Sequence, residues 1–270
     1  MSWNVENLAR WLTARDEFIA HVRVLGDPGV LCLQEIRLRP GDAADIAAMR
    51  ALLPGYSCHF ALANDARNVK FRGGRAHGVA TYIKDRAVTS ATPAWDREGR
   101  VIVTAIDRLA IVNLYAVNGT SKPYFDPDTG VVRGDRHEHK RRFQMQLLDL
   151  AAELRAAGDV VLAGDWNVSR TAADVTPRLR TEEPHATARA QLNGRFAADR
   201  WADVFRVLHP DVRQYTWFGR TRTGALDAAR VDYIVVGEEL LPRVKSAEIL
   251  DDRRLRPHSD HAPLSLELTE

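Results

Sequence analysis

Short apolar runs bordered by polar patches constrain the fold of this chain more than any other feature. Four patches share carboxylate, amide or imidazole groups: Leu33-Gln34-Glu35, Gly164-Asp165-Trp166-Asn167, Arg230-Val231-Asp232 and Ser259-Asp260-His261. Each borders a short run of apolar residues that is typical of a buried β-strand. Carboxylate, amide and imidazole groups gathered at strand ends are suited to metal-assisted hydrolysis of a phosphate ester. The sequence therefore predicts a β-rich fold whose strand ends carry a reaction centre.

Predicted strands and helices mix irregularly along the chain. Apolar β-like runs cover residues 30–34, 78–84, 100–106, 109–115, 160–163, 214–218, 231–236 and 262–268. Helical spacing with capping and stop signals predicts helices over residues 7–22, 43–53, 135–157 and 201–208. Residues 122–134 and 169–195 lack clear periodicity, and we expect loops there. Strict strand–helix alternation is absent, which favours two packed sheets with helices outside.

Size and composition narrow the setting of the protein. A chain of 270 residues fits one large domain or two small ones. Its net charge of +2 is too small by itself to indicate a nucleic-acid partner. Two cysteines favour a reducing compartment, and no apolar stretch has the length of a signal-peptide core or a membrane span. We therefore expect a cytoplasmic, intracellular protein that does not associate with a membrane.

Six motifs in one order resemble a known family. They are Trp3-Asn4-Val5, Leu33-Gln34-Glu35, Tyr115-Ala116-Val117-Asn118-Gly119, Gly164-Asp165-Trp166-Asn167, Tyr215-Thr216-Trp217-Phe218 and Ser259-Asp260-His261-Ala262-Pro263. Together they resemble exonuclease III and the apurinic/apyrimidinic endonucleases of the endonuclease/exonuclease/phosphatase superfamily, over nearly the whole chain. The resemblance implies an α+β fold: a four-layer α/β/β/α sandwich of two packed mixed sheets flanked by helices, as a single domain over residues 1–270. The family has a full strand before the Trp-Asn pair. The chain therefore has either a misassigned start or a truncated first strand at an edge.

The resemblance also implies a metal site. Mg²⁺, with Mn²⁺ as a substitute, prefers oxygen ligands and is usually held by one or two carboxylates. Glu35 matches the principal metal-binding glutamate of the family. The wider set of implied metal contacts is Asn4, Glu35, Asp165, Asn167, Asp260 and His261. Without the other motifs, a single carboxylate at a strand end would more often be an ordinary surface residue.

The family's catalytic roles fall on five residues. By resemblance, Asp165 activates the attacking water or donates a proton to the leaving group, and Asn167 hydrogen-bonds a phosphate oxygen. Tyr115 and His261 contact the scissile phosphate, and Asp232 hydrogen-bonds an active-site side chain, which we expect to be His261. The structural alternatives are an Asx-turn at the Asp-x-Asn motif and a packed strand tyrosine.

Three further residues match DNA contacts of the family. Asn118 and Lys122 match contacts to the DNA backbone, and Trp217 matches an aromatic residue of the abasic-sugar pocket, although a strand tryptophan is more commonly a core residue. The family usually places Trp or Leu where this chain has Ala229, so the pocket is expected to be wider. Basic stretches at 67–75 and 136–142 are candidates for non-specific backbone contact or a solvated surface. The implied partner is double-stranded DNA with abasic sites or 3′ ends, bound by a monomer that is associated with the nucleoid if the cell is bacterial.

Three functions remain open from the sequence. The leading hypothesis is a DNA-repair nuclease: an apurinic/apyrimidinic endonuclease with 3′→5′ exodeoxyribonuclease and 3′-end-trimming activity. The second is a phosphatase or phosphodiesterase of the same superfamily that acts on a small phosphorylated molecule or a lipid head group. The third is an inactive nucleic-acid-binding homologue. Every aligned catalytic position carries a competent residue, which argues against the third.

Overall fold

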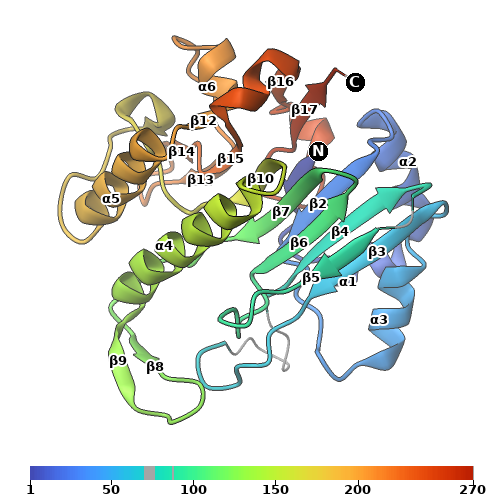
Figure 1. Cartoon of the computed structure of the whole chain (residues 1–270), viewed down its shortest axis with the longest axis horizontal. Helices are drawn as coiled ribbons and strands as arrows, with labels where there is room; N and C mark the ends of the chain where they lie inside the picture. The colour runs from blue at the N-terminus through green and yellow to red at the C-terminus, as the bar shows by residue number, and fades with distance from the viewer. Residues whose placement is uncertain (70–76, 87, 270) are drawn as a thin grey trace.

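Two six-stranded sheets pack face to face, and helices cover both outer faces (Figure 1). The computed structural model describes residues 1–69, 77–86 and 88–269. The layer order is α/β/β/α, which confirms the predicted fold class. Among the described residues, no helix is long and apolar enough to cross a membrane.

The first sheet has the strand order β16-β17-β1-β2-β4-β3. Its strands are β1 (Ser2–Asn4), β2 (Val30–Gln34), β3 (Tyr56–Ala61), β4 (Val79–Lys84), β16 (Val244–Ile249) and β17 (Leu264–Leu268). Its outer face packs on α1 (Ala9–Thr13), α2 (Arg15–Val24) and α3 (Ala43–Arg50). The three-residue β1 lies between β17 and β2, parallel to β2. The expectation of an edge position for the first strand is therefore wrong: pairing on both sides holds this short strand inside the sheet.

The second sheet has the strand order β12-β15-β10-β7-β6-β5. Its strands are β5 (Thr89–Ala91), β6 (Val101–Ile106), β7 (Leu109–Tyr115), β10 (Asp159–Asp165), β12 (Trp201–Asp203) and β15 (Asp232–Gly237). The helices α4 (Arg136–Arg155) and α5 (His185–Ala198) cover its outer face. The predicted capping box of Asp135 and Glu138 begins α4. Phe143 and Leu147 on its predicted apolar stripe are buried against the sheet.

Apolar side chains fill the space between the sheets, and buried polar contacts around Asn113 tie the sheets together. Ile111, Val161 and Ile234 of the second sheet share a buried cluster with strands of the first. Beside this cluster, the fully buried Gln34 donates through Nε2 to Asn113 Oδ1 at 2.8 Å. Buried polar groups are costly unless they are paired, so this contact favours one register between the sheets. Gln34 directly precedes Glu35, and the contact therefore fixes the end of β2.

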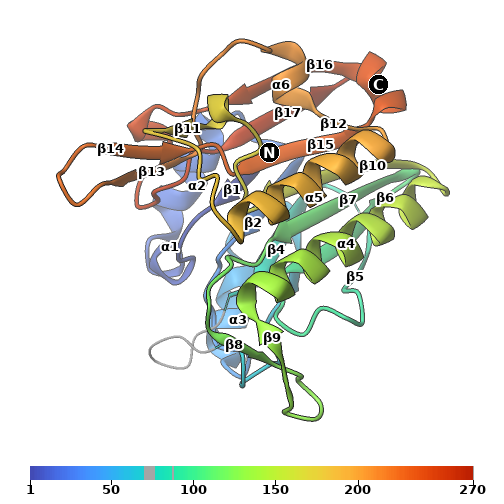
Figure 2. The same cartoon turned by 90° about the vertical axis from the view of Figure 1, so that its left-hand side faces the viewer.

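Two small sheets extend the sandwich, as Figure 2 shows. One consists of β11 (Val175–Thr176), β13 (Trp217–Arg220) and β14 (Leu226–Ala229), and the other is the hairpin of β8 (Pro123–Phe125) and β9 (Val132–Asp135). The remaining elements are α6 (Val204–Leu208), η2 (Ala172–Asp174), η3 (Glu238–Arg243) and η4 (Arg253–Leu255).

The structure corrects several predicted boundaries. The expected loop at 122–134 contains the β8–β9 hairpin, and the expected loop at 169–195 contains η2, β11 and most of α5. The apolar face of α5 uses Ala188, Leu192 and Phe196, and its small first member hides the helical period. Residues 201–203 form a strand rather than a helix, because they pair with β15. The predicted helix over residues 7–22 is two helices, α1 and α2.

Candidate active site

The polar ends of strands from both sheets meet at one edge of the sandwich. Asn4 ends β1, Glu35 follows β2, Tyr115 ends β7 and Asp165 ends β10. In the second sheet Asp165 pairs with Tyr115 on one side, and on the other with Asp232, the first residue of the antiparallel β15. The strand directions therefore collect side chains that are far apart in the sequence.

Asn4 joins the carboxylates of the two sheets. It is fully buried, and its Nδ2 donates to Glu35 Oε1 at 3.0 Å and to Asp165 Oδ2 at 3.1 Å. The same nitrogen lies 3.5 Å from His261 Nε2. The Oδ1 atom of Asn4 accepts from the backbone N–H of Glu6 at 3.0 Å, and this contact fixes the orientation of the Asn4 amide. One short strand thus sets the spacing of the two acids and the imidazole.

The backbone around the two acids has unusual geometry. Glu35 and Asn167 each have a φ of 52°, in the left-handed region that non-glycine residues rarely adopt and that is enriched at functional sites. Gly164 has a φ of +151°, and a Cβ at this position would lie 1.9 Å from the carbonyl oxygen of Leu114. Only glycine therefore allows β10 to approach β7 directly before Asp165.

Burial changes the protonation of Asp165. Its side chain is 1% exposed, and Oδ1 accepts from the N–H of Asn167 at 2.8 Å, so the Asx-turn alternative is also present. Burial and then the nearby charge of Asp232 raise the pKa of Asp165 to about 8, although His261 opposes the rise. A carboxyl group with a pKa near neutrality is suited to accept and return a proton.

His261 and Asp232 form a buried pair. Nδ1 of His261 lies 2.8 Å from Asp232 Oδ2, which confirms the expected hydrogen bond. Burial alone lowers the pKa of His261, but the charge and hydrogen bond of Asp232 raise it to about 10. The imidazole is therefore protonated at neutral pH, and Nε2 faces Asn4. Within the described part of the chain, Asp232 Oδ1 is buried without a hydrogen-bond partner.

The donor atoms at this edge suit a hard divalent cation. Burial raises the pKa of Glu35, but the charge of Arg37 and the hydrogen bond from Asn4 outweigh it and lower the pKa, so the carboxylate is ionised. Oxygens of Glu35 and Asp165 converge on the same amide of Asn4, and magnesium prefers such oxygen ligands. Asp165, Asp232 and His261 also offer ligand atoms within 4.8 Å of one another, although the hydrogen bond to His261 already engages Asp232.

A cavity of about 390 Å³ opens from Glu35 and Asp165 toward the small sheet of β11, β13 and β14. The half-buried Trp217 lines it, and Ala229 lies directly opposite on β14. The indole Nε1 donates to Asp260 Oδ2 at 2.8 Å, whereas Asp260 Oδ1 is 3.9 Å from His261 Nε2. Trp217 therefore belongs to the cavity wall and not to the core, and Asp260 links that wall to the imidazole.

The remaining residues that were predicted to contact metal, phosphate or DNA lie in two different cavities. Asn118 and Asn167 line the same cavity as the two acids, whereas Lys122 lines a second, adjoining cavity. In the basic stretch at 136–142, Arg136 and Lys140 are buried rather than solvated. In the basic stretch at 67–75, the residues from 70 onward lie outside the described residues.

Sequence reasoning missed Lys140 as a part of the site. Its Nζ donates to the backbone oxygen of Asn167 at 2.7 Å, and it lines the cavity that contains Asp165. Burial lowers the pKa of Lys140 to about 8, against the opposing charge of Asp165. Lys140 falls within a basic run of the sequence, and no local signal distinguishes it from its neighbours.

Sequence reasoning also missed a buried ion network beneath Tyr115. Glu98 accepts from Arg100 Nε at 2.6 Å and binds Arg136 through both carboxylate oxygens. Arg100 Nη1 donates to the carbonyl oxygen of Tyr115 at 3.1 Å, and its guanidinium lies 4.9 Å from the centre of the tyrosine ring. The acid-Gly-Arg triplet before β6 was the available signal, because charged residues beside an apolar strand are buried only when paired.

Comparisons with known proteins agree along the whole chain. The model of a family described as Endonuclease/Exonuclease/phosphatase family matches residues 1–261. An exodeoxyribonuclease from Bacillus subtilis (strain 168) is 26% identical over 278 residues, 98% of this chain and 97% of that protein. The structure of a 3′ phosphatase, NExo, from Neisseria bound to product DNA hairpin has a TM-score of 0.73 at 24% identity and covers 100% of this chain and 98% of its own. An AP endonuclease from Archaeoglobus fulgidus has a TM-score of 0.71 at 22% identity, with 99% and 97% covered.

Proposed function

The chain belongs to the endonuclease/exonuclease/phosphatase family, and on that premise we propose that it hydrolyses phosphodiester bonds in double-stranded DNA. The proposed activities are apurinic/apyrimidinic endonuclease and 3′→5′ exodeoxyribonuclease with 3′-end trimming. The observation that carries the proposal is the convergence of Glu35, Asp165 and the His261–Asp232 pair around Asn4, beside a cavity walled by an aromatic residue. We also propose that residues 1–270 form one domain, acting as a monomer.

The proposed mechanism is a single in-line attack of water on the phosphodiester, in which the new bond from water to phosphorus forms as the bond from phosphorus to the leaving 3′-oxygen breaks. Asp165 accepts the proton of the water in its ionised form, which is the minor form at pH 7 and the stronger base for its raised pKa of about 8. The imidazolium of His261, held by Asp232, donates toward a phosphate oxygen, and Asn167 and Tyr115 orient the phosphate. Bound Mg²⁺, or Mn²⁺ as a substitute, would supply electrostatic stabilisation of the developing negative charge.

The proposed metal ligands begin with Glu35, the ionised carboxylate of the site. Asp165 offers the second converging oxygen. We propose Asn4, Asn167 and Asp260 as further contacts to the ion or to the waters it keeps, because magnesium commonly binds through retained waters. His261 joins this set only as a neutral imidazole, since its protonated form offers no lone pair. A chelator should therefore abolish turnover.

The cavity beside Trp217 supports an abasic sugar as one substrate group. A deoxyribose without a base leaves the duplex at a lower cost than an intact nucleotide does. Ala229, the cross-strand partner of Trp217, contributes only a methyl group to the cavity lining, so the cavity also suits trimming of an intact 3′ nucleotide. The exodeoxyribonuclease name of the Bacillus subtilis relative agrees with that second activity.

The test compares two duplex oligonucleotides, one with a single abasic-site analogue and one undamaged with a recessed 3′ end. Each is incubated with the purified protein, with Mg²⁺ and with chelator, and Glu35→Gln is the matched variant. We expect metal-dependent incision 5′ of the lesion and trimming of the recessed end, with both activities greatly reduced in the variant. Trimming of the recessed 3′ end without incision at the lesion would support the nuclease activity and refute the abasic specificity. No cleavage of either duplex would refute the proposal and favour the small-molecule phosphatase or the inactive homologue.

A further inference from the structure

A second cavity adjoins the candidate active site. It has a volume of about 640 Å³ and shares four residues with the first cavity: Glu35, Arg37, Tyr115 and Asn118. The two cavities therefore meet at the strand ends where the scissile phosphate is proposed to bind. A substrate that is cut within a chain must continue beyond that phosphate, and the second cavity offers room for it to do so.

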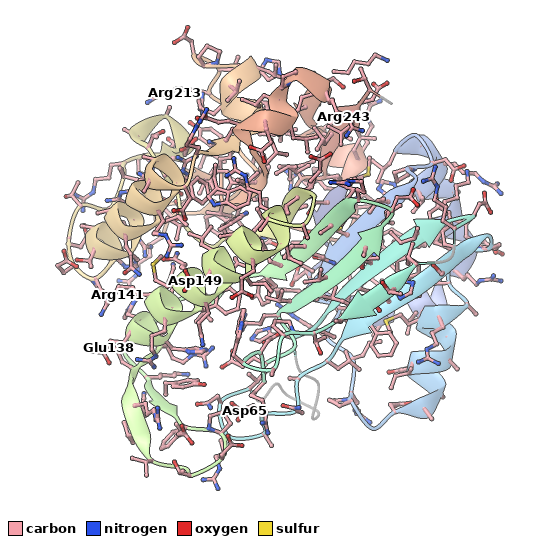
Figure 3. The ribbon with its side chains drawn as sticks, viewed as in Figure 1. Asp65, Glu138, Arg141, Asp149, Arg213 and Arg243 are labelled. Atoms are coloured by element: carbon pink, nitrogen blue, oxygen red, sulfur yellow. The ribbon has the colours of Figure 1, made fainter. Side chains whose placement is uncertain are left out.

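The outer wall of the second cavity is built from two segments that are distant in the sequence. The loop at residues 64–69 contacts the β8–β9 hairpin through Asn68, whose Nδ2 donates to the carbonyl oxygen of Phe125 at 2.6 Å and whose Oδ1 accepts from the N–H of Phe125 at 2.9 Å. The buried Asp65 holds the loop, since Oδ1 accepts from the N–H groups of Arg67 and Asn68 at 3.1 Å each. Figure 3 labels Asp65 where this loop lies beside the hairpin. The paired contacts give the wall a defined shape.

Positive charge gathers on this wall. Arg67 from the loop and Lys122 from the start of the hairpin are both exposed and line the same cavity. Across the described residues, neither side chain forms a salt bridge with an acid. Among the described residues that line the cavity, the carboxylate is that of Glu35, which already pairs with Arg37. A concave surface with this charge attracts an anion.

We propose that this second cavity binds a phosphate of the cleaved strand within two nucleotides of the scissile bond, held by Arg67 and Lys122 together. The assignment rests on the proposed function, because it takes the substrate to be a nucleic-acid strand. It extends the expected backbone contact of Lys122 to a two-sided site whose second side is the loop held by Asn68. The site recognises the phosphodiester charge and not the base.

The experiment replaces one phosphate at a time with an uncharged methylphosphonate, at each position within three nucleotides of the scissile bond. Incision rates are measured for the wild type, Lys122→Ala and Arg67→Ala. Lys245→Ala and Arg200→Ala are the matched controls, because both residues are exposed in their salt bridges and line neither cavity. All these side chains lie on the surface, so folding should be retained.

We expect one position within two nucleotides at which the wild type loses about tenfold in kcat/KM, the size of one charge-assisted contact. On the strand with all its phosphates charged, Lys122→Ala and Arg67→Ala should each lose about tenfold in kcat/KM, mainly through a higher KM. Neutralising that one phosphate should then lower the kcat/KM of either variant little further. The salt slope of each cavity variant should fall by about 1. If the loss in kcat/KM from the cavity substitution and the loss from the methylphosphonate simply add at every position, the assignment of this phosphate site is overturned. The proposed nuclease activity would still stand. A wild type that cleaves no DNA would overturn both this inference and the proposed function.

Discussion

Replacing Asp165 with Asn should make the protein more stable and almost inactive. The carboxyl group is 1% exposed, and its pKa is raised from 3.8 to about 8, first by burial and then by the charge of Asp232. At about 1.36 kcal/mol per pKa unit, keeping Asp165 in this environment at pH 7 costs about 4 kcal/mol relative to the unfolded chain. Asn carries no charge and avoids that cost.

The substitution also introduces an opposing term. The Asn side-chain oxygen can still accept from the N–H of Asn167, but its NH₂ group would face Asn4 Nδ2, which now donates to Asp165 Oδ2. Two donors face to face in a buried site cost about 1–3 kcal/mol. We therefore expect Asp165→Asn to be about 1–3 kcal/mol more stable than the wild type at pH 7 in chelator.

The raised pKa of Asp165 determines how the stability difference between wild type and variant changes with pH. The folded protein holds a proton on Asp165 between pH 3.8 and about 8, whereas the unfolded chain releases it. The stability of the wild type should therefore fall as pH rises through that window and level off above it. The advantage of the variant should grow toward pH 8 and vanish within the window, and below pH 3.8 only the donor–donor cost remains, so that the variant is there about 1–3 kcal/mol less stable than the wild type.

Chemical denaturation in chelator at a series of pH values measures the stability difference, and single-turnover incision with Mg²⁺ measures activity. Loss of the proton acceptor should lower the rate by about 10²–10⁴-fold. A variant that is less stable than the wild type at pH 8 would refute the electrostatic reasoning. A variant with full activity would refute the catalytic assignment.

Three further substitutions test other parts of the site. Asp232→Asn should lower the pKa of His261 from about 10, because it removes the largest of the effects that oppose burial, and an unchanged imidazole titration by NMR would contradict the pairing. Ala229→Trp should fill the space beside the indole and raise the ratio of abasic incision to 3′ trimming by about tenfold, the size of a modest pocket contact; an unchanged ratio would remove this residue from specificity. Arg100→Met should destabilise the fold by about 3–5 kcal/mol in urea denaturation, because it removes one of the cations that neutralise the buried Glu98; a loss below about 1 kcal/mol would show that the remaining cation suffices.

The order of the polar motifs, through the family that it resembles, was sufficient to predict the sandwich and the polar groups that stand at its strand ends. Glu35 and Asp165 each follow an apolar run, and a strand that ends in a carboxylate places it at the edge of a sheet whatever the neighbouring strands are. The capping box at Asp135 and Glu138 is equally local, since both partners lie within one helical turn. Features that depend on residues close in the sequence were therefore read correctly.

Features that depend on partners far away in the sequence were not predicted correctly. Residues 201–203 have a helix-like composition, and only their pairing with β15 makes them a strand. Lys140 resembles its basic neighbours in the sequence until the fold brings the backbone of Asn167, 27 residues away, within 2.7 Å of its ammonium group.

The sequence by itself determined which chemical groups would stand at the strand ends. The tertiary structure alone decided how they share protons and charge: that Asn4 bridges the acids of two sheets, that the carboxylate of Asp232 keeps His261 protonated, and that burial raises the pKa of Asp165. The physical reason is that hydrogen bonds and desolvation act over a few ångströms of space. The spacing of residues along the chain does not report those distances.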